Sequence, residues 1–440
     1  ISGVKVVDWQ NFFPTAGSFS GSSGGPGEPS MYIVKDSEQT AYPPASGSGQ
    51  SPIEKGRGYY TRLENSDGLT LEVTGNPFQG NVAYNLSAAG DGWNLLGNPY
   101  ASSIAWGNDP EAWIGNGVGN TIAVKEITMI DGQTVGRYRY YDRLLGNGIV
   151  KPGQGFWIHA FGSAPSLTST EKAKTFAQDD YPVQNSTANY LRITLAQGNK
   201  SDEAWILLSE DATSGFDDAF DVLKLPNEGI FNLSTLVAGE DVAVNYLSDS
   251  FCSESVALSI QDVAPGNYSL SFSGLETLAD IGEIKLQDDF TGSTTVVTSD
   301  AVEFAVTDDP NSSGSARFIL TFERNTLDTS SPQVSAADVC AGDPAVVIIT
   351  DVQEGVDYTV MNLDGEPISS VVTGVGDEIS IPLYGSLLVD GVNEARILAG
   401  FKGCSDEYLD DEVEFSYTGP FEIEVPEEIS VCAGDQAVIQ

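Results

Sequence analysis

The stretch 92–106 reads GWNLLGNPYASSIAW and is the most informative part of the sequence for the fold. It holds three large aromatic residues, two glycines and an Asn-Pro turn. Two other segments resemble each other on either side of it, KGRGYY at 55–60 and KPGQGFW at 151–157. In both, a pair of aromatic residues follows a Gly-x-Gly. Large rings beside glycines in strand-like sequence usually fill the core of a sandwich. The three segments therefore predict one β-sandwich module over 1–175.

The same rings allow a second interpretation, a platform on which sugar rings stack. Core packing is favoured because large aromatic side chains are usually buried. The ligand surface stays open as the alternative, and a glycan or another surface ligand is the partner that it implies. Its candidate residues are Trp93, Tyr100, Trp106, Tyr59, Tyr60 and Trp157.

The composition predicts an all-β chain of several domains. A length of 440 residues exceeds that of one ordinary domain. The 47 Gly and 21 Pro, without a long amphipathic helical pattern, favour many short strands joined by turns. One hairpin is predicted between 122–130 and 135–141, because Asp131-Gly132 is a favoured turn pair.

Two further modules and a repeat follow a Ser/Thr-rich linker. Clean alternation begins with YLRITL at 190–195 and predicts an acidic, antiparallel β-sandwich over 189–324. Short strands over 336–420 predict an immunoglobulin-like sandwich. Within it VCAGDPAV begins at Val339, and VCAGDQAV begins at Val431. Residues 421–440 are therefore expected to start a further immunoglobulin-like repeat, truncated here. We expect an internal piece of a larger protein, with further repeats of the same chain as neighbours.

The net charge of −43 is unevenly distributed. Residues 1–175 carry 12 Lys and Arg against 15 Asp and Glu, whereas residues 176–440 carry 8 against 48. So acidic a chain repels phosphate backbones, which argues against nucleic acid as a partner. A solvated acidic surface is the favoured interpretation, and a Ca²⁺ site is the alternative. The best candidates for calcium are Asp217, Asp218 and Asp221. No apolar run reaches 18 residues, so no membrane-spanning helix is predicted.

The four cysteines predict an oxidised, exported protein. Cys340 and Cys404 fall in one module, and a disulfide between them is expected to contribute about 4 kcal/mol on the chain-entropy model. Cys432 repeats Cys340, so its partner is expected beyond residue 440. Cys252 has no evident partner and is interpreted as a small, buried or half-buried thiol. Such disulfides are typical of exported proteins.

The sequence offers no catalytic motif. His159 is the only histidine and lies on a predicted strand, without the Gly-x-Ser-x-Gly turn of a serine hydrolase. A catalytic triad needs partners that no motif supplies here, so His159 is expected to pack or to lie on a strand surface. Phosphate-binding loops and Cys-x-x-Cys pairs are also lacking. We therefore expect a protein without enzymatic activity.

The stretch 92–106, followed by KPGQGFWI at 151–158, resembles large cell-surface proteins of Bacteroidota exported by the type IX secretion system. Ala101 and Ala105 depart from that pattern, which has Pro and Asp there. DEAWI at 202–206 and ATSGFD at 212–217 are similar to the module that often follows. The VCAGD segments resemble immunoglobulin-like repeats of adhesin and gliding-associated proteins. The resemblance implies export by the type IX secretion machinery to an outer-membrane-associated, extracellular location.

These observations predict a non-enzymatic, exported cell-surface stalk or adhesin segment of a larger multidomain protein. Two alternatives stay open. One is a carbohydrate-binding accessory module of an exported polysaccharide-degrading enzyme. The other is a subunit of an extracellular fibre.

Overall fold

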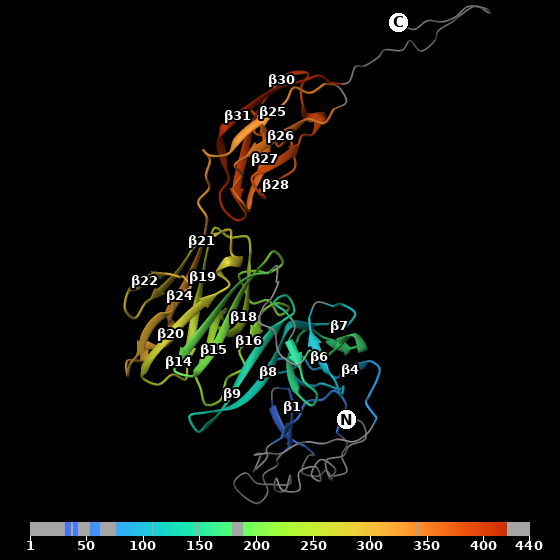
Figure 1. The fold of residues 1–440 in the computed structure, drawn as a ribbon, viewed down its shortest axis with the longest axis vertical. Coiled ribbons are helices and arrows are strands. Elements are labelled where there is room, and N and C mark those ends of the chain that lie inside the picture. Colours follow the sequence, from blue (N-terminus) through green and yellow to red (C-terminus); the bar gives the residue numbers. More distant parts are fainter. Residues whose placement is uncertain are drawn as a thin grey trace, which may run out of the picture. The chain divides into compact units, whose positions relative to one another are not determined.

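The computed structural model describes residues 31–36, 38–42, 53–61, 76–107, 109–146, 148–177, 188–340 and 343–419. This part is built from strands and four single-turn 3-10 helices, which confirms the all-β prediction (Figure 1). None of those helices has the length and apolar character that a membrane crossing requires. The repeat predicted for 421–440, with Cys432, lies outside the described residues. The 3-10 helices are Glu171–Ala173, Leu275–Thr277, Pro310–Ser312 and Gly385–Leu387.

The chain forms two compact units. Unit 1 comprises Ile1–Asp249, Ser253–Leu278 and Glu283–Glu323. Unit 2 begins its main part at Arg324 and also takes in two short segments, Ser250–Cys252 and Ala279–Gly282.

The first part of unit 1 consists of small antiparallel sheets. In one of them β5, from the stretch 92–106, pairs with β11, from the second Gly-x-Gly segment, with Leu96 opposite Phe156. The two motifs that dominate the sequence are therefore neighbouring strands. The sheets have the orders β2-β1-β3, β10-β6-β13, β5-β11-β8-β9 and β4-β12-β7. Their strands are β1 (Met31–Lys35), β2 (Glu38–Ala41), β3 (Tyr60–Thr61), β4 (Val82–Tyr84), β5 (Trp93–Gly97), β6 (Ser103–Trp106), β7 (Trp113–Asn116), β8 (Val118–Ile130), β9 (Gln133–Asp142), β10 (Gly148–Val150), β11 (Gly155–Ala160), β12 (Ser166–Ser169) and β13 (Lys174–Thr175).

The predicted hairpin is confirmed as β8 and β9. Its turn is Asp131-Gly132, with Ile130 opposite Gln133. Both turn residues have positive φ, 52° and 79°. That conformation suits a tight hairpin turn, whose twist matches that of the strands.

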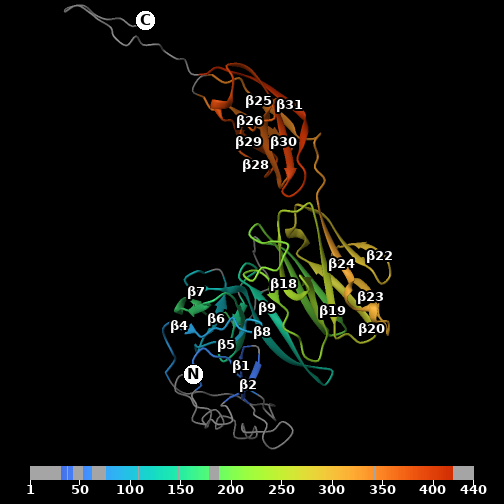
Figure 2. The same ribbon diagram turned by 180° about the vertical axis from the view of Figure 1, so that it is seen from behind.

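The second part of unit 1 is one large, curled sheet of eleven strands (Figure 2). Its order is β22-β21-β24-β19-β17-β18-β15-β14-β20-β23, and β16 also pairs with β18. The prediction of a purely antiparallel module is wrong at one place, because β15 and β18 run parallel, with Trp205 opposite Val244. The chain between them crosses over through β16 and β17, a connection that local alternation does not reveal. The strands are β14 (Asn189–Gln197), β15 (Lys200–Ser209), β16 (Val222–Leu223), β17 (Asn232–Val237), β18 (Glu240–Ser248), β19 (Ser253–Gln261), β20 (Gly266–Ser273), β21 (Ile281–Asp288), β22 (Ser293–Val296), β23 (Val302–Val306) and β24 (Gly314–Arg324).

The modules predicted as separate over 1–175 and 189–324 share a hydrophobic cluster. Trp93, Tyr138 and Trp157 come from the first module, and Trp205 and Tyr246 from the second. A second cluster, around Trp106, Trp113 and Phe156, belongs to the first module alone. The two modules are thus parts of one compact unit, and the predicted Ser/Thr-rich linker does not separate two independent cores.

Unit 2 is a sandwich of two antiparallel sheets, β25-β26-β29 and β28-β27-β30-β31. Inward residues of both sheets, such as Val347 and Ile381 on one and Tyr358 and Ile397 on the other, form its core. This is the arrangement expected of an immunoglobulin-like module. The strands are β25 (Gln333–Ala336), β26 (Val346–Thr350), β27 (Val356–Asn362), β28 (Val372–Thr373), β29 (Glu378–Pro382), β30 (Gly391–Phe401) and β31 (Glu407–Tyr417).

Candidate functional site

Four of the six aromatic residues considered for ligand stacking are buried. Trp93, Tyr100, Trp106 and Trp157 each expose less than a tenth of their surface. Trp93 meets Trp157 edge-on at a centroid distance of 6.5 Å, and the Trp106 Nε1–H donates to the carbonyl of Asn120 at 2.7 Å. These four rings are core residues, so the ligand-surface interpretation is wrong for them.

The other two, Tyr59 and Tyr60, are half-buried and already have partners. The Tyr59 hydroxyl accepts a hydrogen bond from the Glu54 amide at 2.8 Å, and its ring lies 5.3 Å from that of Tyr42. The Tyr60 hydroxyl lies 2.9 Å from that of Tyr138. Burial raises the pKa of Tyr59 well above its ordinary value. Both rings therefore serve packing within unit 1.

The two asparagines of the stretch explain its turns. The Asn94 amide donates to the carbonyls of Ser87 and Gly92, at 2.8 and 2.9 Å. The Asn98 amide donates to the carbonyls of Ser102 and Val150, at 2.9 and 3.0 Å. Asn94 lies within β5 and holds the turn that precedes this strand, whereas Asn98 holds the turn that follows it. The motif is thus a folding element that positions β6 beside β10.

His159 is a packed histidine. Its ring is buried and meets Trp93 edge-on at 5.8 Å. Burial is the main effect on its pKa, which lies below the ordinary value although the Asp218 charge opposes the shift. Gly92 has a φ of +71°, and a Cβ there would lie 2.7 Å from His159 Nε2. Gly92 is therefore required both by its conformation and by the space that this ring occupies.

The calcium candidates are occupied by backbone and side-chain donors of the protein itself. The Asp217 carboxylate accepts hydrogen bonds from the Thr213 amide and hydroxyl, at 2.7 and 2.9 Å. The buried Asp221 accepts from the amides of Asp217 and Tyr246, at 2.8 and 2.7 Å. Asp218 contributes to the electrostatics of His159 instead. Across the residues that the structure describes, no group of three or more His, Cys, Asp or Glu is placed to hold a metal ion.

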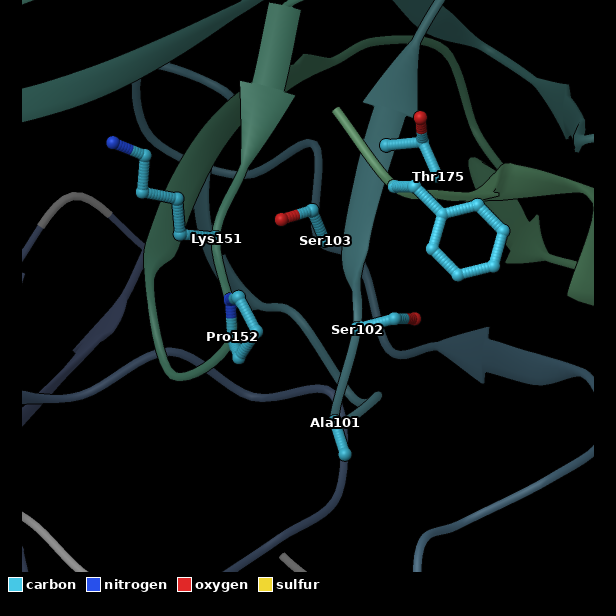
Figure 3. Close-up of a pocket in the computed structure, with 7 residues that line it drawn as sticks. Ala101, Ser102, Ser103, Lys151, Pro152 and Thr175 are labelled. Atoms are coloured by element: carbon cyan, nitrogen blue, oxygen red, sulfur yellow. The ribbon is translucent and has the colours of Figure 1, made fainter. Parts of the chain in front are cut away.

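An open cavity of about 480 Å³ lies at one end of the sheet β10-β6-β13, and the sequence did not indicate it (Figure 3). Phe176 lines it, and that side chain is fully exposed. The other lining residues come from the start of β6, the turn after β10 and the end of β13. They are Ala101, Ser102, Ser103, Lys151, Pro152 and Thr175.

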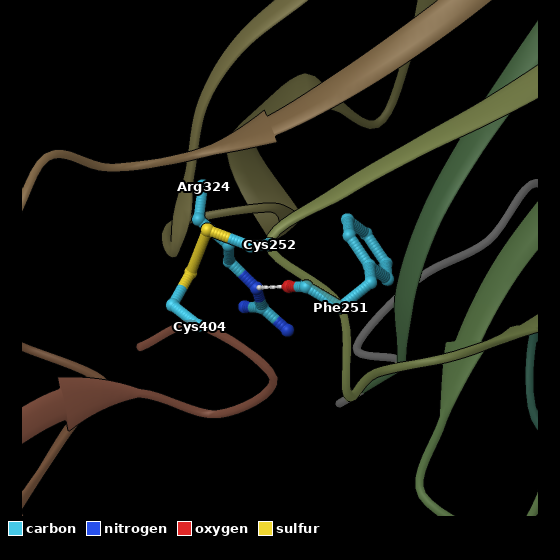
Figure 4. Close-up of a disulfide and its surroundings, with 4 residues drawn as sticks. All are labelled: Phe251, Cys252, Arg324 and Cys404. Atoms are coloured by element: carbon cyan, nitrogen blue, oxygen red, sulfur yellow. Dashed lines mark hydrogen bonds between the residues drawn. A yellow bond between two sulfur atoms is a disulfide. The ribbon is translucent and has the colours of Figure 1, made fainter. Parts of the chain in front are cut away.

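The predicted disulfide is wrong in its pairing. Cys404 bonds to Cys252, with the Cα atoms 4.6 Å apart, and Cys340 is an exposed free thiol (Figure 4). Cys252 directly precedes β19, and Cys404 lies in the turn between β30 and β31. Sequence separation alone suggested a bond within one module. The segment Ser250–Cys252, however, belongs to unit 2 and is brought against that turn. The interpretation of Cys252 as a lone thiol is wrong for the same reason.

Arg324 secures the same region. Its backbone amide donates to the Cys252 carbonyl at 3.0 Å, and its Nε donates to the Phe251 carbonyl at 3.1 Å. Its Nη1 donates to the Asp280 carboxylate at 2.7 Å. The arginine therefore ties the main part of unit 2 to both of its short segments.

Comparisons with protein families and with curated proteins found no match. Among solved structures, the chain is similar to a tetra-tandem repeat in the extending region of a large adhesion protein. That structure is 14% identical with a TM-score of 0.17, over 68% of this chain and 66% of the other. It is also similar to the BSP domain of a biofilm associated protein, at 10% identity and a TM-score of 0.17, over 74% and 63%. In both, the match spans less than two thirds of the other chain. Similarity at this low sequence identity and TM-score supports no functional conclusion about this chain.

Proposed function

We propose that this chain is a non-enzymatic segment of an exported cell-surface protein, an adhesin-type stalk built from β-sandwich modules. The observation that carries the proposal is the disulfide between Cys252 and Cys404. Disulfides of this structural kind persist in oxidising compartments and are rare in the cytosol. Cys252 is exposed and Cys404 is half-buried, and the Arg324 backbone amide donates a hydrogen bond to the Cys252 carbonyl.

Two further observations support a structural role at a cell surface. The large aromatic residues of the stretch 92–106 are core residues, and the only histidine is packed against them. The charge of −43 is suited to a solvated surface that resists association with like-charged neighbours. Export by type IX secretion, and a place at the outer membrane, rest on the motif resemblance and belong to the same proposal.

Limited proteolysis of intact source cells, followed by peptide mass analysis, tests the location. We expect peptides of this chain to be released while a cytosolic marker stays intact. Alkylation before cell lysis should label Cys340 and spare Cys252 and Cys404. Recovery of the chain only from the cytosol, with Cys252, Cys340 and Cys404 all alkylated, would overturn the proposal.

A further inference from the structure

We propose that the cavity beside Phe176 binds a saccharide that carries a carboxylate, such as a uronate unit of a polysaccharide. This inference goes beyond the stalk role, which needs no ligand. It rests on the proposed function only for the location, because a protein at the cell surface would encounter such a polysaccharide. The cavity combines an exposed ring, hydroxyl groups and one cation, and each matches a different part of such a sugar.

The register of the sheet places the polar groups in one row. Thr175 lies directly opposite Ser103 across β13 and β6. Val150 lies opposite Ile104 across β10 and β6, so Lys151 continues that strand beside Ser103. Directly opposite residues of an antiparallel pair share one face of the sheet. Figure 3 shows Lys151 and Thr175 on either side of Ser103. An ammonium and two hydroxyl groups therefore face a ligand from three adjacent strands.

Lys151 is available for an anion. No carboxylate of the described residues forms an ion pair with its ammonium, whereas the nearby Lys172 and Lys174 pair with Glu111 and Glu171. A single ammonium matches a single carboxylate, and a charge-assisted hydrogen bond between them is stronger than one between neutral groups. Doubly charged phosphate groups would favour more than one cation.

Phe176 supplies the apolar part of the site. An exposed phenyl ring at the rim of a polar cavity offers the flat apolar face that the C–H side of a pyranose can cover. Pro152 and Ala101 extend this apolar surface along the cavity. Most binding sites combine apolar walls with a few placed polar groups in this way.

The Ser102 hydroxyl adds an independent indication. Its oxygen is shielded from solvent and has no hydrogen-bond partner among the described residues. Unsatisfied polar atoms of this kind are rare in native proteins. Rotation of the Ser102 side chain toward the cavity would expose this oxygen, and a sugar hydroxyl would then supply the partner that it lacks.

Calorimetric titration of the full chain with a trigalacturonate tests the proposal. We expect saturable binding that weakens at least tenfold in Phe176→Ala, in Lys151→Met and with the carboxyl-reduced trisaccharide. Raising the salt concentration should weaken binding to the wild type but not to Lys151→Met. Tyr408→Ala, which removes another exposed ring, and Lys172→Met, which removes a nearby lysine outside the lining, are the matched controls and should bind like the wild type.

Three results would overturn the proposal. These are no saturable binding by the wild type, equal binding of the carboxyl-reduced sugar, or unchanged affinity in both cavity variants. Tighter binding of a sulfated trisaccharide would overturn the assignment of the anion to a carboxylate. Ser102→Ala should weaken binding without lowering the melting midpoint, which separates ligand contact from misfolding. Failure of binding leaves the surface location to be judged by proteolysis of intact cells, so the two proposals fail separately.

Discussion

The Arg317 guanidinium donates from Nε and Nη2 to the two carboxylate oxygens of Asp288, at 3.0 and 2.9 Å. Its Nη1 donates to the Ala305 carbonyl at 2.7 Å. Asp288 ends β21, next to the edge strand β22, and Ala305 lies on β23 at the opposite end of the sheet order. One buried arginine therefore joins strands from both ends of the eleven-stranded sheet.

Replacement of this arginine should be strongly destabilising. Arg317→Met leaves Asp288 without its partner in a buried setting, and a loss of about 3–5 kcal/mol is expected. Arg396→Met breaks the exposed pair with Glu412 and is the control, with an expected loss below about 1 kcal/mol. Urea denaturation measures both. Equal losses of unfolding free energy in the two variants would contradict the conclusion that Arg317 joins the two ends of the sheet.

Asp221 should make stability depend on pH in mildly acidic solution. Burial, aided by the nearby Asp217, raises the pKa of Asp221 to about 6. Its unfolded pKa is about 4, so the folded state holds the proton over the interval between the two values. The contribution of this group is therefore complete below about pH 4 and is lost as the pH rises through about 6, a change of about 3 kcal/mol.

The variant Asp221→Asn should remove that slope. The difference in unfolding free energy between wild type and variant is measured at intervals from pH 4 to pH 7, so that other titrating groups cancel. Asp211→Asn, in the exposed turn after β15, serves as the control and should leave the profile parallel to that of the wild type. A parallel profile for Asp221→Asn would contradict the assignment.

Local signals predicted the strands and the hairpin well. Asp131-Gly132 carries its turn geometry in the residue types themselves, and alternation revealed β14 from its first residues. Contacts between distant segments were beyond such reasoning. The packing of Trp157 with Trp205 in one cluster, the parallel pairing of β15 with β18, and the approach of Cys252 to Cys404 all depend on tertiary topology.

The cavity could not have been predicted for a related reason. Lys151 and Thr175 meet on either side of Ser103 only because β10 and β13 both pair with β6. The sequence patterns drew attention to the buried rings of the stretch 92–106 instead. Large aromatic residues beside glycines gave the core, and the exposed ring of Phe176 lies in an unremarkable polar segment.

Trp157→Ala should destabilise unit 1 as a whole. The side chain belongs to the cluster shared by the two predicted modules, so its truncation is expected to cost about 3–5 kcal/mol. Unfolding followed by tryptophan fluorescence and by far-ultraviolet circular dichroism should shift together. The control is Ile114→Ala, which truncates an exposed side chain on β7 and should change stability by less than about 0.5 kcal/mol. Two separate transitions in the variant would indicate independent modules.

Calcium should have little effect on unit 1 at the acidic turn. The Asp217 and Asp221 carboxylates already accept hydrogen bonds from four donors of the protein, and a cation would have to displace them. We expect the same melting midpoint with excess EDTA and with millimolar Ca²⁺. A rise of several degrees with Ca²⁺ that is absent in Asp217→Asn would show that the cation does bind there.

The disulfide between Cys252 and Cys404 should contribute strongly to the stability of the chain. The bonded cysteines are 152 residues apart in sequence, and closing so long a loop is worth about 5 kcal/mol on the chain-entropy model. Cys404→Ser should therefore lower stability markedly, whereas Cys340→Ser changes an exposed, free thiol and should not. Non-reducing peptide mapping should recover Cys252 and Cys404 in one linked species. Recovery of Cys340 linked to Cys404 would restore the pairing expected from the sequence.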